Sequence, residues 1–217
     1  MRKQVMAKEA MAKEAGRVMH SKGHLFVFIG PGGSGKTAMI CRIQAERPEC
    51  RFVPTTTTRP ARPGEAHGRE YFFASDGEFE HLRLCGGLLE WERIHGHLYG
   101  TSRRRIEEVL VADAVGLTSL DYKGGRAVRH AYPRNTTTIF VQPASLDELR
   151  TRLEARAGST PEDVAARLHR TAEELRHADE FDHVITNRNG HLDDAVAAAL
   201  HIMEETLAAG RLAGGPR

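Results

Sequence analysis

The sequence has few cysteines and none of the patterns that usually make them functional. Its three cysteines, Cys41, Cys50 and Cys85, stand far apart and form no CxxC pair. This spacing argues against a zinc site and a disulfide framework, and it fits a protein of the reducing cytoplasm. His95 and His97 are two residues apart, but no third or fourth ligand stands beside them, so we interpret them as turn histidines.

Long apolar runs and a large excess of one charge are also missing. No segment reaches the roughly 18 consecutive apolar residues of a membrane-spanning helix, and the N-terminus lacks the apolar core of a signal peptide. Lys and Arg number 31 against 29 Asp and Glu, which gives a formal net charge of +2. We therefore expect a soluble protein without a membrane or nucleic-acid partner, and the sequence leaves monomer and homodimer open.

The 217 residues suffice for one α/β domain with an insertion. Strand-like and helix-like segments alternate, which predicts a mainly parallel sheet with helices between its strands. Glycines and prolines interrupt this alternation over residues 55–101, where we expect an inserted β-rich subdomain. We assign 1–22 to an N-terminal helical extension, 23–208 to the domain and 209–217 to a flexible tail. The expected strands are 24–29, 51–55, 88–94, 114–121, 137–142 and 183–186, and the expected helices are 36–46, 102–112, 146–157, 161–178 and 192–207.

The stretch GPGGSGKT, from Gly30 to Thr37, satisfies GxxxxGK[ST] between a predicted strand and a predicted helix. Its glycines allow successive backbone N–H groups to turn toward a phosphate, and the helix N-terminus adds partial positive charge. Lys36 would then reach the β- and γ-phosphates, and the Thr37 hydroxyl would hold Mg²⁺. We predict a nucleoside triphosphate site whose contacts come from Gly30, Gly33, Ser34, Gly35, Lys36 and Thr37.

A second phosphate site is indicated within the predicted insertion. Arg59 and Arg62 are three residues apart, and Glu65 and Tyr71 follow them. Two guanidinium groups and a phenol hydroxyl can surround one doubly charged phosphate with charge-assisted hydrogen bonds. Taken alone, RPxRPG is equally typical of a proline-rich loop with exposed arginines. Together with the first motif, it favours a phosphorylated acceptor.

Through these two motifs and several further segments, the chain resembles the guanylate kinase family from about residue 25 to 200. The resemblance is carried by the phosphate loop and by TTRPARPGEAHGREYFF, LLEWERIHGHLYGTS, LDYKGG, PASLDELRTRLEARAGSTPEDVAARL and FDHVITN. It implies a P-loop kinase three-layer α/β fold with a GMP-binding insertion at about 55–101 and a helical lid at about 156–178. It also implies transfer of the γ-phosphate of ATP to GMP with Mg²⁺.

The resemblance also implies roles for single residues. An ionised Glu90 could accept the N1–H and the amino group of guanine, where adenine presents an acceptor instead. Matching positions place Arg59, Arg62, Tyr71 and Tyr99 at the GMP phosphate, and Thr55, Glu90 and Thr101 at the guanine. Lys36, Arg156 and Arg167 match positions at the transferring phosphoryl group, Asn187 is assigned to the ATP site, and Asp121 is assigned to the Mg²⁺ shell or to structure.

The chain departs from the family pattern Asp-x-Asp-x-Gln-Gly, since it reads SLDYKGG from Ser119 to Gly125. Ser119 replaces an acid, which would remove one charged acceptor from the base pocket. Lys123 replaces the glutamine and would add a positive charge near the nucleotide phosphates. Two alternatives therefore stay open: a kinase acting on a modified purine nucleotide or a sugar phosphate, and a non-catalytic module that binds phosphorylated peptides.

Overall fold

The computed structural model describes residues 21–94, 96–155 and 160–213, with side chains to residue 210. Most of the predicted N-terminal extension lies outside these residues, and so do His95, Arg156 and residues 214–217. Within the described ranges, no helix is both long enough and apolar enough to cross a membrane.

The centre of the fold is a five-stranded sheet in which every neighbouring pair is parallel, as the alternation of strands and helices predicts. β1 is its middle strand and is fully buried from its second residue onward, because its run of large apolar side chains has neighbours on both faces. The strand order is β2-β7-β1-β8-β9. The strands are β1 (His24–Ile29), β2 (Arg51–Phe52), β7 (Val115–Leu120), β8 (Thr136–Pro143) and β9 (His183–Asn187).

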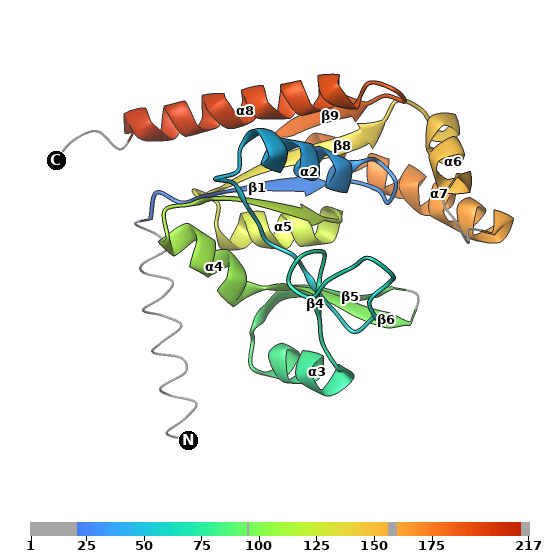
Figure 1. Ribbon diagram of the computed structural model, residues 1–217, viewed down its shortest axis with the longest axis horizontal. Helices are drawn as coiled ribbons and strands as arrows, with labels where there is room; N and C mark the ends of the chain where they lie inside the picture. Colours follow the sequence, from blue (N-terminus) through green and yellow to red (C-terminus); the bar gives the residue numbers. More distant parts are fainter. Residues whose placement is uncertain (1–20, 95, 156–159, 214–217) are drawn as a thin grey trace.

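Helices cover both faces of this sheet, which gives the predicted three layers (Figure 1). α2 (Lys36–Glu46) and α8 (Leu192–Ala213) pack on one face, where Phe26 and Phe28 of β1 belong to their apolar cluster. α4 (Arg103–Val111) and α5 (Tyr122–Ala131) pack on the other face, which β1 supplies with Leu25, Val27 and Ile29. The alternation along β1 therefore builds two separate cores on one strand.

The insertion, residues 55–102, forms a second sheet on one side of the central sheet (Figure 1). Its β-rich character agrees with the sequence, but its helix α3 (Asp76–Leu84) was not predicted. Ser75 and Glu78 form a capping box at the start of α3, and Phe79 is its buried residue. The strand order is β4-β3-β6-β5, with β3 (Thr56–Thr57), β4 (Phe72–Phe73), β5 (Leu88–Ile94) and β6 (His97–Ser102).

The insertion returns to the core without a linker. Ser102 is both the last residue of β6 and the N-cap of α4. The first turn of α4 also contacts the insertion directly, since Arg105 donates to the Thr56 hydroxyl over 3.0 Å and lies 3.3 Å from the centre of the Phe72 ring. Further along α4, Ile106 and Leu110 are buried in the core. One short helix thus touches both parts of the molecule.

Two helices follow β8 at the carboxyl end of the sheet (Figure 1). α6 (Leu146–Glu154) and α7 (Pro161–Leu175) pack through Leu149, Leu153, Val164 and Leu168. Thr160 and Asp163 form a capping box at the start of α7, whose first helical residue is Pro161. Only α7 falls within the predicted lid, residues 156–178, and we call it the lid helix after that prediction. A 3₁₀ turn (Ala178–Glu180) then leads to β9.

Two segments differ from the expectations. Tyr122–Ala131 forms helix α5, which its two glycines obscured in the sequence; Asp121 caps it by accepting from the Gly124 backbone over 2.8 Å. A Cβ at Gly125 would lie 2.2 Å from Cδ1 of Ile29, so this close approach requires glycine. The last helix, α8, continues to Ala213, beyond the predicted helix end at residue 207.

Candidate active site

The predicted phosphate loop, residues 30–37, lies at the carboxyl edge of the central sheet. It follows β1, the strand at which the direction of sheet growth reverses, and such switch points are where open α/β sheets bind ligands. Gly30, Gly33 and Gly35 have φ values of 134°, 94° and 100°, which L-residues with side chains rarely adopt. The glycines at these motif positions therefore have a conformational reason in the structure.

Side chains from two later elements fasten this loop. The Asn187 amide at the end of β9 donates to the Ser34 carbonyl over 2.8 Å. Arg152 of α6 donates to the same carbonyl over 3.2 Å and to the Asn187 carbonyl over 2.6 Å. Arg152 was missed in the sequence, although it precedes Arg156 by four residues and so belongs to the same face of a predicted helix. Asn187, which the sequence assigns to the ATP site, therefore contacts the phosphate loop through its side chain.

Substituting Gly35 with alanine should destabilise the loop strongly. The new Cβ would meet Nδ2 of the buried Asn187 at 2.1 Å, and the residue would keep a φ of +100°. Strain of this kind costs about 1–3 kcal/mol before the clash is counted, which corresponds to a fall in Tm of about 3–10 °C for a domain of this size. Differential scanning calorimetry would measure this fall in Tm.

Gly32→Ala is the matched control for this substitution. Gly32 belongs to the same loop, its φ is not positive, and a Cβ there would meet nothing within 4 Å. We expect a Tm for Gly32→Ala close to that of the parent protein. Equal melting temperatures for the Gly35 and Gly32 variants would contradict the described loop conformation.

The Lys36 ammonium turns back onto its own loop. Its Nζ donates to the Gly30 carbonyl over 2.6 Å and to the Pro31 carbonyl over 2.9 Å. Burial lowers the pKa of Lys36 to about 8, and the nearby Glu174 and Asp121 carboxyl groups oppose this shift. Glu174, on lid helix α7, was also missed in the sequence; it is buried, and burial raises its pKa. The lysine thus lies near two acidic groups, one on α7 and one at the start of α5.

Several buried polar atoms on the loop and on α7 have no hydrogen-bond partner among the described residues. The Ser34 hydroxyl, Nε of Arg167 and Oε2 of Glu174 are buried without a hydrogen bond. Unpaired buried polar groups are costly, so a site holding them is suited to a polar ligand. Arg167, a predicted catalytic residue, is on α7 beside the buried Leu168. Arg156, its predicted companion, lies outside the described residues.

The predicted metal ligands differ in their availability. Thr37 is exposed in the first turn of α2, so its hydroxyl is open to a ligand. Asp121 uses Oδ1 to cap α5, and no cluster of three His, Cys, Asp or Glu side chains suited to a metal occurs among the described residues. Mg²⁺ commonly binds one or two protein ligands together with nucleotide phosphates and water. The residues present fit a Mg²⁺ ion that arrives with its nucleotide.

The structure brings most of the predicted acceptor residues together. Nη2 of Arg59 donates to both carboxylate oxygens of Glu65 over 2.9 Å, and this ion pair is largely buried. Its guanidinium lies 5.3 Å from the centre of the Tyr71 ring, and the Tyr71 and Tyr99 ring centres are 6.0 Å apart. Glu65 thus orients the arginine before any ligand binds. We call Arg59, Glu65, Tyr71 and Tyr99 the phosphate clamp.

Two other predicted acceptor residues contribute through the backbone in this structure. The Arg62 side chain is exposed, while its backbone N–H donates to Glu65 over 2.8 Å. The Thr55 carbonyl accepts from the Phe72 N–H over 2.8 Å, which connects the start of β3 to β4. These contacts shape the loop around the phosphate clamp.

Glu90 and Thr101 lie side by side on β5 and β6, as paired residues of the antiparallel ladder. The Thr101 hydroxyl donates to Oε1 of Glu90 over 2.6 Å. Burial raises the pKa of Glu90 to about 7, and the Asp121 and Glu92 carboxyl groups add to this shift. The same oxygen lies 3.3 Å from where a Cβ of Gly124 would be, so Glu90 faces the start of α5.

Ser119 is not beside Glu90. It is the register partner of Phe28, whose side chain packs with α2 and α8. Glu90 faces Gly124 of α5, and α5 covers the opposite face of the sheet together with Leu120. The prediction that the serine removes a contact from the base pocket is therefore wrong, because successive residues of β7 point to opposite faces.

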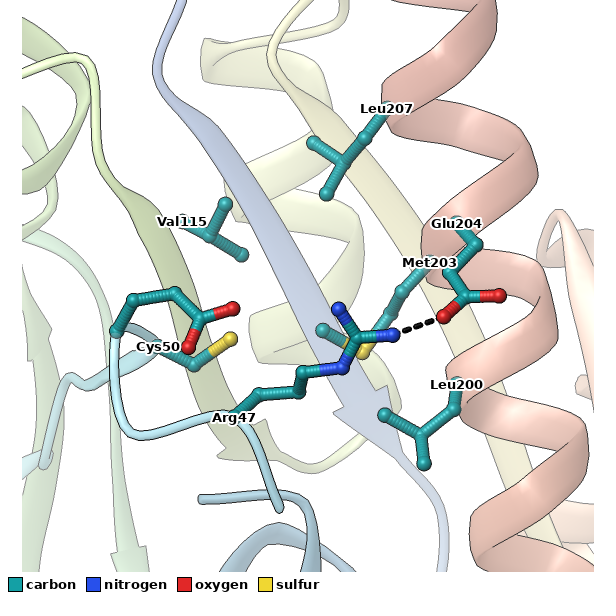
Figure 2. Close-up of a pocket in the computed structure, with 8 residues that line it drawn as sticks. Arg47, Cys50, Val115, Leu200, Met203, Glu204 and Leu207 are labelled. Carbon is teal, nitrogen blue, oxygen red and sulfur yellow. Dashed lines mark hydrogen bonds and ion pairs between the residues drawn. The ribbon is translucent and has the colours of Figure 1, made fainter. Parts of the chain in front are cut away.

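Two surface cavities lie away from the carboxyl edge and contain none of the predicted site residues. One, of about 540 Å³, is an open hollow lined by Arg126, Arg129, His130 and Pro133. The other, of about 40 Å³, lies between the end of α2, β7 and α8, with Arg47 hydrogen-bonded to Glu204 beside it (Figure 2). It is too small for a nucleotide, since ligand pockets span about 300–1,000 Å³. Its lining residues are Arg47, Glu49, Cys50, Val115, Leu200, Met203, Glu204 and Leu207.

Comparison with known proteins shows which family the chain belongs to. A family model described as guanylate kinase matches residues 22–206. The chain belongs to the guanylate kinase family. A guanylate kinase of Symbiobacterium thermophilum is 42% identical over 166 residues, covering 76% of this chain and 78% of the relative. A guanylate kinase of Gluconobacter oxydans is 38% identical over 182 residues, covering 84% and 86%.

A solved structure agrees with the guanylate kinase assignment. The crystal structure of guanylate kinase from Anaplasma phagocytophilum has a TM-score of 0.68 and 25% sequence identity, covering 85% of this chain and 86% of that one. The matched range includes the phosphate loop, the phosphate clamp and Glu90. The P-loop kinase fold predicted from the sequence is thereby confirmed.

Proposed function

We propose that the protein transfers the γ-phosphoryl group of ATP to GMP, with Mg²⁺ bound to the donor nucleotide. The observation that carries this proposal is the arrangement of two unlike phosphate sites: a glycine loop with Lys36 at the sheet edge, and the phosphate clamp in the insertion. A buried carboxyl group, Glu90, accompanies the second site. Membership of the guanylate kinase family supports the same reaction.

Phosphoryl transfer requires little covalent chemistry from the protein. Phosphoryl transfer needs neutralised charge on the moving group and an in-line arrangement of donor and acceptor oxygens. Lys36 and Arg167 would supply cationic charge to the transferring group, and the Thr37 hydroxyl and Asp121 would serve the Mg²⁺ shell. Arg59, Tyr71 and Tyr99 would hold the acceptor phosphate, whose oxygen is already ionised near neutral pH, so no general base is required.

Base choice would depend on Glu90. An ionised carboxylate that accepts from the Thr101 hydroxyl still has free lone pairs for the N1–H and amino donors of guanine. A sugar phosphate has no base whose N–H donors could use these lone pairs, which disfavours that alternative. A phosphopeptide-binding module would have no use for Lys36 held among acidic neighbours, which disfavours the other.

The proposal is tested by a coupled assay of ADP release with ATP and Mg²⁺. The acceptors would be GMP, dGMP, AMP, IMP, CMP and UMP, each at equal concentration. We expect turnover with GMP well above that with AMP, since a site built for specific hydrogen bonds can reject a mismatched base by about 10⁴. Turnover with another acceptor and none with GMP would overturn the proposal.

We expect GMP binding to strengthen as pH rises through the pKa of Glu90. With a pKa of about 7 in the free protein, Glu90 is largely protonated at pH 6 and must lose its proton to accept both guanine donors. The apparent Kd should then fall by about tenfold between pH 6 and 8, because only the ionised fraction is competent. Isothermal titration calorimetry without ATP would measure this change.

The Glu90→Gln variant separates this effect from titration of the GMP phosphate. The phosphate group titrates in both experiments, whereas the amide introduced by the substitution does not titrate. The variant should bind GMP more weakly, discriminate less between GMP and AMP, and retain only the pH slope that the phosphate contributes. Identical pH slopes for the two proteins would refute the role of Glu90.

A further inference from the structure

One ion pair connects the insertion to the central domain close to Glu90. Nζ of Lys123, in the first turn of α5, lies 2.6 Å from Oε1 of Glu92 on β5. Glu92 is two residues after Glu90, so both side chains belong to the same face of β5. That face is turned toward α5, because the Glu90 carboxyl group approaches Gly124, the residue after Lys123. The pair and the base-pocket carboxyl group therefore occupy one contact surface.

The ammonium of Lys123 is placed among acidic groups. Glu92 and Asp121 share a side-chain hydrogen bond, and Glu90 lies close enough for both to act on it electrostatically. Three carboxyl groups from two parts of the molecule thus converge on the start of α5. When these groups are ionised, like charges repel across the contact, and its closeness then depends on a cation. Lys123, one of the departures from the family pattern, brings this charge.

We propose that Lys123 is a positioning residue for the acceptor base pocket: its ion pair with Glu92 fastens β5 to the first turn of α5 and holds Glu90 against Gly124. This inference rests on the proposed function, and it gives the lysine a place beside the base pocket, whereas the sequence suggested the nucleotide phosphates. Neither residue of the pair needs to touch the nucleotide. Their effect would be to keep the pocket formed before GMP arrives, which lowers the ordering cost of binding.

We expect loss of this ion pair to have a small effect that is confined to GMP binding. The two side chains are 52% and 36% exposed, and exposed pairs contribute little, so we expect Lys123→Met to weaken GMP binding by about fivefold. The KM for GMP should rise by a similar factor, while kcat and the Kd for ATP stay within about twofold. A general loss of folding would instead change all three together. Lys123→Arg keeps the charge and should restore most of the affinity.

A double-mutant cycle tests whether Glu92 is the partner. Lys123→Met leaves Glu92 beside Asp121 without its cation, whereas Glu92→Gln removes that repulsion. The double variant should therefore bind GMP more tightly than Lys123→Met alone, which independent sites would not show. Arg126→Met is the matched control, since Arg126 is also on α5 but pairs with Glu180, away from β5. Its GMP affinity should equal that of the parent protein.

The measurement is a GMP titration without ATP, followed by tryptophan fluorescence and by calorimetry. Trp91 is the single tryptophan of the chain and lies between Glu90 and Glu92 on β5. An absence of GMP binding by the parent protein would overturn the proposed function and this inference with it. Binding by the parent and an unchanged Kd for Lys123→Met would overturn the inference alone, as would a double variant no tighter than Lys123→Met.

Discussion

Replacing Lys36 with alanine is expected to lower kcat by about 10³ or more, because the lysine is the cation of the predicted donor loop. Removing a single preorganised group of this kind typically costs about 10²–10³ in rate, and the charge of Lys36 raises the expected loss to about the upper limit. The coupled assay with saturating ATP and GMP would measure it. The KM for GMP should change little, since the acceptor binds at the phosphate clamp.

The same substitution should not weaken the fold at neutral pH. The pKa of Lys36 is lowered from 10.5 to about 8, so the folded protein disfavours the charged form and gains stability as pH rises from about 8 to 10.5. Lys36→Ala should therefore melt no lower than the parent at pH 7, and any advantage should shrink by pH 10. Lys22→Ala, at an exposed lysine whose contact is made by its backbone, is the control for both measurements. An active Lys36→Ala enzyme would exclude the assigned donor loop.

Replacing Arg59 with alanine is expected to raise the KM for GMP by about 10² and to lower kcat far less. Arg59 is held by the contact of its Nη2 with both oxygens of Glu65 and by the Tyr71 ring, so its guanidinium would reach the acceptor phosphate with little further ordering. A charge-assisted contact of this kind is worth about 1.5–3 kcal/mol, which corresponds to about 10–10² in affinity, and the loss leaves the Glu65 carboxylate without its Arg59 partner beside a bound anion. Initial-rate kinetics over a range of GMP concentrations would measure it.

Two variants show whether the fork of Arg59 or only its charge matters. Arg59→Lys keeps the charge but replaces the several N–H groups of the planar guanidinium by one compact ammonium, so it cannot hold Glu65 and a phosphate in the same geometry and should recover only part of the affinity. Arg69→Ala is the matched control, because Arg69 lies in the same loop but pairs with Glu70 at the surface. If Arg69→Ala and Arg59→Ala gave equal values of KM, the acceptor phosphate would have to bind elsewhere.

The features that the sequence predicts well are those set by local physics. The run of apolar residues in β1, the glycines at Gly30 and Gly35, and the alternation of strands with helices each follow from short-range rules. Family resemblance added the grouping of Arg59, Tyr71 and Tyr99, which are far apart along the chain. Composition alone does not predict that these side chains meet.

The features that the sequence did not predict depend on contacts between distant segments. Helix α5 contains two glycines that lower its intrinsic propensity, and the reason for one of them appears only in the packing, where a Cβ at Gly125 would collide with Ile29. Arg152 resembles any surface arginine until β9 and the phosphate loop are brought to it. The position of Ser119 depends on which face of β7 it occupies, and that is fixed by its register with β1.

The direct passage from β6 into α4 limits how the two sheets can move relative to each other. No linker separates β6 from α4 at Ser102, so we expect a rotation of the insertion to move α4 as well. The first turn of α4 contacts β3 and β4 through Arg105, and its later turns are buried in the core. We expect α4 to pivot near Ile106, where the helix enters the core. We expect any closing of the acceptor site over GMP to tilt this helix slightly, so that close packing around Ile106 and Leu110 would oppose the motion.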